Sequence, residues 1–362
     1  MTKAYLYLET GEMLPATSFA YKINKPVISE IVFNTSMQGY QEVLTDPSYC
    51  DQSIVMTYPL IGNYGTNQDD SEAIIPHLKT LIVRDYCEHP SNFRSTHSLK
   101  QFLISKKIQG LCHLDTRYLT KIIRNQGTMK CIVSPGELSK NELADLFSPD
   151  LKSDQIERIS TKAISHFPSN GGKRVILIDF GYKKNILESL LKRSCDVIVV
   201  PWDTDFETIK DFNPAGILLS NGPGDPKSIL KVIPTIQKLQ DNYPLFAICM
   251  GHQIFALANG GDTEKMKFGH RGGNHPVQDL TTKKVFITAQ NHGYCVKEDS
   301  LNESELEASH VNLNDKSIEG LRHKTKPAFS VQFHPEASPG PHDTKYLFDD
   351  FIKLMQGEGN NA

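Results

Sequence analysis

The segment Pro244–Ala258, which reads PLFAICMGHQIFALA, decides the fold of the second half of this 362-residue chain. Its first part is an apolar run that ends at Cys249, and its second part has the apolar spacing of a helix. The segment therefore predicts a strand, a sharp turn and a helix, with a thiol at the turn. Such a turn aims the thiol at the N-terminus of the helix, where backbone N–H groups and the helix dipole favour an anion.

A cysteine at this position has two interpretations. An ordinary thiol has a pKa of about 8.5 and is only about 3% ionised at pH 7, so the helix terminus would raise its reactive fraction. The other interpretation is a cysteine that is buried for packing. Cys249 is therefore a candidate nucleophile, and other segments of the chain must decide between the two interpretations.

A second segment, Pro327–Glu336, reads PAFSVQFHPE and predicts a strand that ends at a histidine. Residues two apart share a face of an extended chain, so His334 and Glu336 point the same way. A base with a carboxylate to hold its tautomer would complete a Cys-His-Glu triad. His252 is a rival base one turn beyond Cys249, but no carboxylate lies near it in sequence.

A third segment, Leu218–Pro226, reads LLSNGPGDP and predicts a strand that runs into a glycine-rich loop. Gly222 and Gly224 would offer unshielded N–H groups, and with the N–H of Met250 these could hold a developing oxyanion. A plain turn is an equally open interpretation, because this composition is typical of turns. The polar strand end 290–294, QNHGY, is weak evidence by itself.

The chain divides where its composition changes. A polar stretch from Asp145 to Gly172 is followed by apolar runs that alternate with helical patterns. Strands buried on both faces favour a doubly wound parallel sheet, in which ligands lie at the carboxyl ends of the strands. We therefore expect an α/β protein, with a strand-rich mixed N-terminal domain and a doubly wound, mostly parallel second domain. The expected boundaries are 1–145 for the first domain, 146–172 for a linker and 173–358 for the second domain.

The composition excludes several classes of function. There are 39 basic and 42 acidic side chains, and a net charge of −3 predicts no attraction to nucleic acid or membrane. No apolar run reaches 18 residues and no signal-like segment begins the chain, so we expect a soluble, cytoplasmic protein. Seven cysteines without a Cys-x-x-Cys pair indicate reduced thiols. His270 and His275 lack further ligands at metal-binding spacing, so we expect no metal.

Together these motifs resemble a known family. Residues 173–356 look like a class I, triad-type glutamine amidotransferase domain, since its motifs occur in the family's order. Three further strings are similar to the small, glutamine-hydrolysing subunits of carbamoyl-phosphate synthetases. They are MKFGHRGGNHP at 266–276, FNTSMQGYQE at 33–42 and LTDPSY at 44–49.

The resemblance implies a role for each matching residue. Cys249 would attack the side-chain amide of glutamine to form a γ-glutamyl thioester and ammonia. His334 would transfer the proton, and Glu336 would orient it. The implied L-glutamine-binding residues are Ser48 in the N-terminal domain and Gly222, Gly224, Met250, Gln253, Asn291, Gly293 and Tyr294 in the second domain.

The resemblance also implies a partner. A large synthetase subunit would use the ammonia with bicarbonate and ATP, and ATP and Mg²⁺ are expected on that subunit. We expect no cofactor on this chain, which has no phosphate-binding glycine loop and no acidic cluster suited to Mg²⁺. The family usually has glycine where Ala247 stands, which would strain the turn if that position required a positive φ.

Two alternatives belong to other classes. One is a non-catalytic regulatory subunit of the same fold, which the presence of Cys249, His334 and Glu336 disfavours. The other is an amidotransferase subunit of a different synthetase, which the N-terminal domain disfavours.

Overall fold

The computed structural model describes residues 1–357 and divides the chain into two compact units, Met1–Lys152 and Ser153–Ala362. Each unit has a hydrophobic core of its own. Mixed α/β architecture, with a strand-rich first unit, confirms the predicted fold class.

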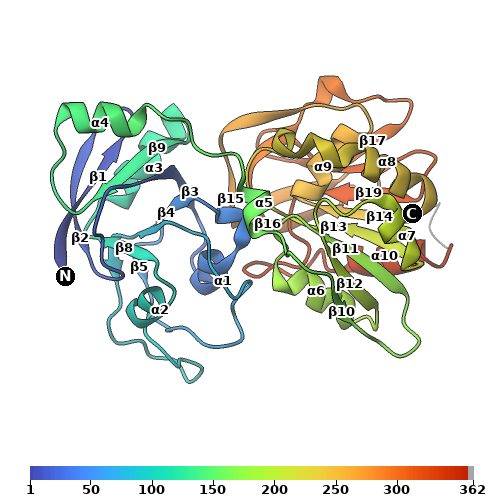
Figure 1. Ribbon diagram of the computed structural model, residues 1–362, viewed down its shortest axis with the longest axis horizontal. Coiled ribbons are helices and arrows are strands. Elements are labelled where there is room, and N and C mark those ends of the chain that lie inside the picture. The colour runs from blue at the N-terminus through green and yellow to red at the C-terminus, as the bar shows by residue number, and fades with distance from the viewer. Residues whose placement is uncertain (358–362) are drawn as a thin grey trace. The chain divides into compact units, whose positions relative to one another are not determined.

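The first unit is built around a closed barrel of strands in the order β1-β2-β8-β6-β4-β3-β9 (Figure 1). Strands β3, β4, β6 and β8 are parallel neighbours, whereas β1 joins β2 and β9 in antiparallel pairs. The pairing of Tyr5 with Ser134 closes the barrel between strands that lie far apart in the sequence. The strands are β1 (Thr2–Leu8), β2 (Met13–Ser18), β3 (Val27–Asn34), β4 (Gln52–Met56), β6 (Thr80–Ile82), β8 (Gln109–Cys112) and β9 (Met129–Ser134), with β5 (Leu60–Ile61) and β7 (Asp85–Tyr86) as a separate pair.

Side-chain caps fix the ends of several helices in this unit. Helix α2 begins with a capping box between Ser98 and Gln101, and Asp115 caps α3. Each cap satisfies a backbone N–H that the helix itself leaves without an acceptor. The helices are α1 (Tyr40–Thr45), η1 (Pro47–Tyr49), α2 (Leu99–Ser105), α3 (Thr116–Gln126) and α4 (Lys140–Phe147).

The second unit contains one large sheet in the order β10-β12-β11-β13-β14-β19-β18-β17-β15-β16. Strands β12, β11, β13, β14 and β19 run parallel to one another, and the strands at both ends of the sheet are antiparallel additions. The parallel strands are β11 (Arg174–Asp179), β12 (Asp196–Pro201), β13 (Gly216–Leu219), β14 (Leu245–Ile248) and β19 (Ala328–Val331). The antiparallel strands are β10 (Ser165–Phe167), β15 (Thr263–Asp279), β16 (Val285–Val296), β17 (Leu306–Asn312) and β18 (Ile318–His323).

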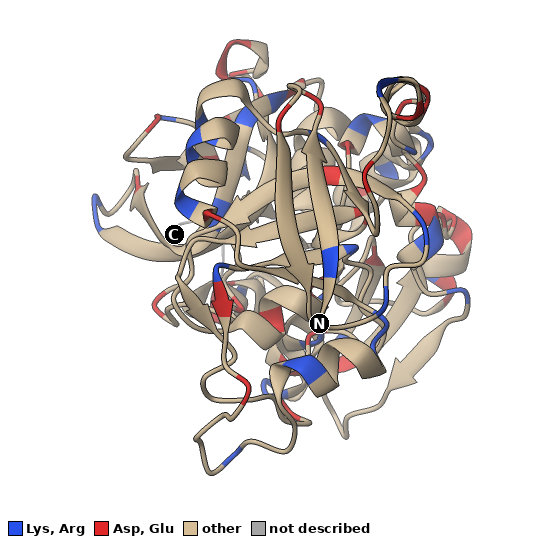
Figure 2. Cartoon of the chain, turned by 90° about the vertical axis from the view of Figure 1, so that its left-hand side faces the viewer, with Lys and Arg blue, Asp and Glu red and all other residues tan. Residues whose placement is uncertain are grey.

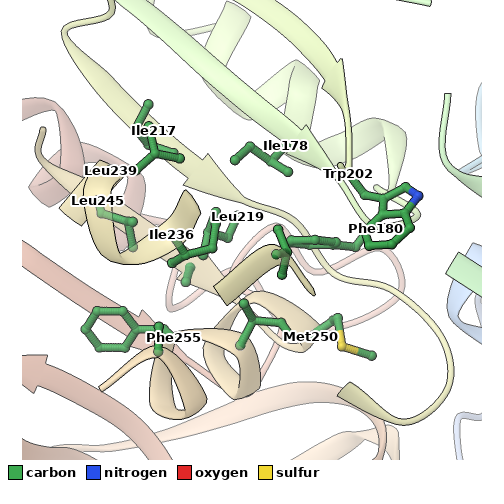
Figure 3. Close-up of a cluster of buried hydrophobic side chains, with 14 of the residues drawn as sticks. Ile178, Phe180, Trp202, Ile217, Leu219, Ile236, Leu239, Leu245, Met250 and Phe255 are labelled. Atoms are coloured by element: carbon green, nitrogen blue, oxygen red, sulfur yellow. The ribbon is translucent and has the colours of Figure 1, made fainter. Parts of the chain in front are cut away.

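Helices cover both faces of the parallel strands. Ile176 and Ile178 of β11 belong to one buried cluster, and Val175 and Leu177 belong to the other. This alternation follows the two-residue period of a strand, and it explains why the strands are apolar throughout. Figure 3 shows the first cluster, between the sheet and helices α8 and α9. The helices are α5 (Gln155–Ile159), α6 (Lys184–Leu191), α7 (Phe206–Asp211), η2 (Pro226–Val232), α8 (Ile233–Asn242), α9 (Met250–Ala258), η3 (Glu298–Ser300) and α10 (Tyr346–Leu354).

The polar segment 146–172, predicted to be a linker, contains regular secondary structure. It includes helix α5 and strand β10, and β10 pairs with β12 at one edge of the large sheet. Basic and acidic residues are interspersed along the elements in Figure 2, in keeping with the small net charge. Among residues 1–357, every helix is too short or too polar to cross a membrane.

Candidate active site

Cys249 stands at the junction between β14 and α9, where the chain turns sharply. Its backbone has φ 53° and ψ −104°, a region that residues with a side chain rarely adopt. Such conformations persist where the surrounding structure enforces them, and they are found at functional sites. Ala247 is fully buried in β14 and its φ is not positive, so the turn at Cys249 forms without demanding glycine two residues earlier.

Close backbone packing surrounds this turn. The N–H of Gly251 donates to the carbonyl oxygen of Ser220 over 3.0 Å. A Cβ atom on Gly251 would lie 2.5 Å from the carbonyl oxygen of Leu219, and one on Gly222 would lie 2.4 Å from that of Phe180. Both distances are far below van der Waals contact. Glycine is therefore required here for close approach, whereas Gly224 has a φ of +83°.

Met250, the predicted oxyanion donor, is the first residue of α9. Its side chain points into the hydrophobic core beneath the sheet and is 1% exposed (Figure 3). Only its backbone is available to the site. As the first residue of α9, it has no intrahelical acceptor for its N–H, since a helix leaves its first N–H groups unpaired. Contact of Met250, Gly222 and Gly224 with substrate stays a prediction.

His334 and Glu336 follow β19, the strand next to β14. His334 Nδ1 lies 2.6 Å from Glu336 Oε1, and both side chains are buried. The N–H of Cys249 donates to Val331 on the same neighbouring strand, over 2.9 Å. The carboxyl ends of two adjacent parallel strands thus bring the candidate nucleophile and the candidate base together.

The electrostatics of this pair are strongly coupled. Burial by itself would lower the pKa of His334, but Glu336 and then Cys249 outweigh it and raise the pKa to about 10. Burial opposes ionisation of Glu336 as well, yet Lys183 and His334 lower its pKa to about 2. His334 Nε2, the other ring nitrogen, is buried and has no hydrogen-bond partner within residues 1–357. An imidazole held from one side, with its other nitrogen unoccupied, is suited to proton transfer.

Lys183 is a residue of the site that the sequence analysis missed. It follows β11, is 3% exposed, and its Nζ lies 3.0 Å from Glu336 Oε1. The same ammonium donates to the carbonyl oxygen of Ala337, just beyond the triad carboxylate. The sequence could have indicated a role for Lys183 through its position after the carboxyl end of a central strand. The adjacent Lys184 made the choice between two lysines impossible from sequence.

Asn291, one of the predicted glutamine-binding residues of β16, lies beside Cys249. The thiol donates to the carbonyl oxygen of Asn291, with Sγ and O 3.6 Å apart. Gln253 Nε2 donates to the carbonyl oxygen of Tyr294 over 2.9 Å and to Gln332 Oε1 over 3.0 Å. Gln253 therefore braces the strand from helix α9. Direct contact of Gln253, Asn291, Gly293 or Tyr294 with glutamine stays a prediction.

Ser48 belongs to the first unit, in the short helix η1. Its backbone N–H donates to Asp46 Oδ1 over 2.9 Å, and its side chain is buried. The local conformation is thus fixed by a side-chain cap. The role of Ser48 in glutamine binding stays a prediction.

His252, the alternative candidate base, is hydrogen-bonded to Ser330. It is fully buried, its Nδ1 lies 2.8 Å from Ser330 Oγ, and burial lowers its pKa to about 3. A histidine with so low a pKa is a poor proton acceptor at neutral pH.

Of the two histidines considered for a metal site, His270 lies in a cluster with potential ligands. Atoms of His270, His292 and Glu319 lie within 4.8 Å of one another. His275 lies outside this trio, although its ring is 5.1 Å from that of His270. Both carboxylate oxygens of Glu319 already accept hydrogen bonds, and both nitrogens of His292 already lie within 3 Å of an oxygen, to one of which the ring donates. These bonds account for the arrangement without an ion.

Comparisons with known proteins agree with this geometry. Two family models match: carbamoyl-phosphate synthase small chain, CPSase domain, over residues 6–133, and glutamine amidotransferase class-I over residues 176–354. The carbamoyl phosphate synthase small chain of Listeria monocytogenes serotype 4b is 50% identical over 359 residues, covering 99% of this chain and 98% of the relative.

The chain belongs to the carbamoyl-phosphate synthase small chain family. The small chain of Clostridium acetobutylicum is 51% identical over 97% of this chain and 100% of its own length. The pyrimidine-specific small chain of Bacillus subtilis is 51% identical over 98% of this chain and 96% of its own length. The family predicted from the motifs is thereby confirmed, and both halves of the chain contribute to the match.

Proposed function

We propose that the chain is the glutamine-hydrolysing subunit of a carbamoyl-phosphate synthase and supplies ammonia to a large subunit. Family membership over nearly the full length supports the assembly, because a small chain implies a large one. The observation that carries the chemistry is the placement of Cys249 and the His334–Glu336 pair on adjacent strand ends. A different synthetase is disfavoured by the match of residues 6–133 to the CPSase domain.

In the proposed reaction the thiol of Cys249 gives its proton to His334, and its sulfur attacks the side-chain amide carbon of L-glutamine. The C–N bond breaks, the amide nitrogen takes a proton from His334 and leaves as ammonia, and a γ-glutamyl thioester remains. Water then attacks the thioester, His334 accepts its proton, and glutamate is released with the thiol restored.

Each part of the site meets one requirement of this reaction. The N-terminus of α9 favours the developing oxyanion, for which the Met250 N–H is the proposed donor. Glu336 holds the tautomer of His334 and stabilises the imidazolium. We propose no cofactor on this chain and assign ATP and Mg²⁺ to the large subunit.

The test measures glutamate and ammonia release from glutamine by the purified chain, alone and with a large subunit, ATP and bicarbonate. Slow hydrolysis alone that rises sharply in the complete system would support both the triad and the partner. A stable complex without hydrolysis would favour the regulatory alternative. Hydrolysis that does not respond to the large subunit would contradict the proposed coupling.

A further inference from the structure

Glu319 is a buried carboxylate near the start of β18, the strand that pairs with β19. Its side chain is fully buried, which is costly for a charge unless partners compensate for the lost water. Neither the family motifs nor the proposed mechanism gives it a role.

Polar contacts connect Glu319 to three other strands of the sheet, of which β17 is its direct neighbour. Its Oε2 accepts from Gln290 Nε2 of β16 over 2.8 Å, and its Oε1 accepts from Asn312 Nδ2 of β17 over 3.2 Å. His270 Nδ1 of β15 lies 3.3 Å from Oε1. Glu319 therefore links β18 to its neighbour β17 and also to β15 and β16, which lie beyond β17 in the sheet order.

His270 supplies the compensating charge. Its Nε2 lies 2.8 Å from Asp315 Oδ2, so each ring nitrogen faces a carboxylate oxygen. Carboxylates only accept hydrogen bonds, and both contacts can be made only by the imidazolium. Burial would lower the pKa of His270, but Asp315 and Glu319 together raise it to about 9.

The network reaches the candidate glutamine site through His292. Gln290 Oε1 lies 2.9 Å from His292 Nε2, and His292 Nδ1 lies 2.7 Å from the carbonyl oxygen of Tyr294. Burial holds the pKa of His292 well below its usual value, so the neutral ring donates a hydrogen bond to one of these two oxygens. Asn291, between them in sequence, presents its carbonyl oxygen to the Cys249 thiol. A series of polar contacts within hydrogen-bond distance thus runs from Glu319 through Gln290 and His292 to the strand beside the nucleophile.

We propose that Glu319 is a positioning residue for glutamine binding, which fixes the segment 291–294 through Gln290 and His292. The proposal rests on the proposed function. Because the series ends on the predicted binding strand and not on His334 or Glu336, its loss should weaken glutamine binding more than the chemical step.

The test is steady-state glutamine hydrolysis by the full chain in complex with a large subunit. Glu319→Leu, which removes the acceptor, should raise KM for glutamine about tenfold and leave kcat within about threefold. Glu319→Gln keeps an oxygen that can accept from Gln290, so its KM should stay within about threefold of wild type. Glu307→Leu, at an exposed position of β17, is the matched control and should change neither constant.

A double-variant cycle tests whether the residues act in series. Gln290→Leu should raise KM as Glu319→Leu does, and the double variant should be no worse than either single variant. A wild-type KM in Glu319→Leu, an equal defect in Glu319→Gln, or multiplied effects in the double variant would overturn the proposal. If Glu319→Leu does not fold, an unchanged KM in Gln290→Leu overturns it instead. A wild-type complex that neither binds nor hydrolyses glutamine would overturn the proposed function itself, and this proposal with it.

Discussion

Lys183 and Glu336 form a buried ion pair, with Nζ and Oε1 3.0 Å apart. The same carboxylate oxygen lies 2.6 Å from His334 Nδ1, so one oxygen is shared by two cationic partners. Replacing one member of a buried ion pair costs about 3–5 kcal/mol, because the remaining charge loses its compensation. Lys183 therefore holds Glu336 ionised and in place behind His334.

We expect Lys183→Met to lower both stability and the rate of glutamine hydrolysis. A loss of about 3 kcal/mol corresponds to a fall in Tm of about 6–12 °C for a unit of this size. Thermal unfolding and glutamate release measure the two effects. Lys184→Met, at the exposed neighbouring position, is the control. If the two variants behave alike, the ion pair has no such role.

The coupled triad also predicts a pH profile for stability. The pKa of His334 is raised from 6.5 to about 10, so its contribution is complete below pH 6.5 and is lost as the pH rises toward 10. The pKa of Glu336 is lowered from 4.5 to about 2, so its contribution is complete above pH 4.5 and is lost as the pH falls toward 2. The stabilising contributions of both residues are therefore complete between pH 4.5 and 6.5.

Chemical denaturation of wild type and Glu336→Gln across pH 4–10 checks this profile. The difference in unfolding free energy should be largest between pH 4.5 and 6.5 and should shrink on the alkaline side. A difference that is constant with pH would contradict the assigned ion pairs. Glu307→Gln, at an exposed position, controls for the general loss of a carboxylate.

Cys249→Ser should remove glutamine-dependent synthesis and leave assembly intact. A serine hydroxyl at this site is a far weaker nucleophile, and loss of a nucleophile typically costs more than about 10³-fold in rate. The complex should still make carbamoyl phosphate from added ammonia. Cys87→Ser, in the first unit, is the control. Retained hydrolysis in Cys249→Ser would refute the nucleophile assignment.

Sequence patterns predicted those parts of the molecule that depend on local order. The apolar strand ending at Cys249 and the strand ending at His334 placed both residues at strand ends, which fits a single site at the edge of the sheet. The barrel was not predicted, because its closure depends on the pairing of Tyr5 with Ser134, which no local pattern encodes.

The roles of Lys183 and Glu319 could not be predicted from the sequence, for physical reasons. A lysine is normally solvated, and only its packing shows that Lys183 is buried while Lys184 is exposed. Glu319 lies in a strand that also contains Arg322 and His323, so its charge does not stand out in the sequence, and its partners come from three other strands.

Gly222→Ala tests the tight loop beside the nucleophile. The added Cβ would lie 2.4 Å from the carbonyl oxygen of Phe180, so the loop must move. We expect kcat for hydrolysis to fall more than about tenfold, because displacement of an oxyanion donor costs about 3 kcal/mol. Gly136→Ala is the control, since nothing lies within 4 Å of its Cβ. Wild-type kcat in Gly222→Ala would show that the loop contributes no such donor.

Ala247→Gly tests how the turn at Cys249 is formed. If the turn required a positive φ at position 247, glycine would relieve strain and stabilise the protein. Ala247 instead lies in β14, fully buried and without a positive φ, so glycine should destabilise by about 0.5–1 kcal/mol through chain entropy. Activity should be unchanged, because the strain resides at Cys249 itself, with φ 53°. Denaturation midpoints and glutamine hydrolysis rates of wild type and Ala247→Gly measure the two effects. A more stable glycine variant would place the strain at position 247.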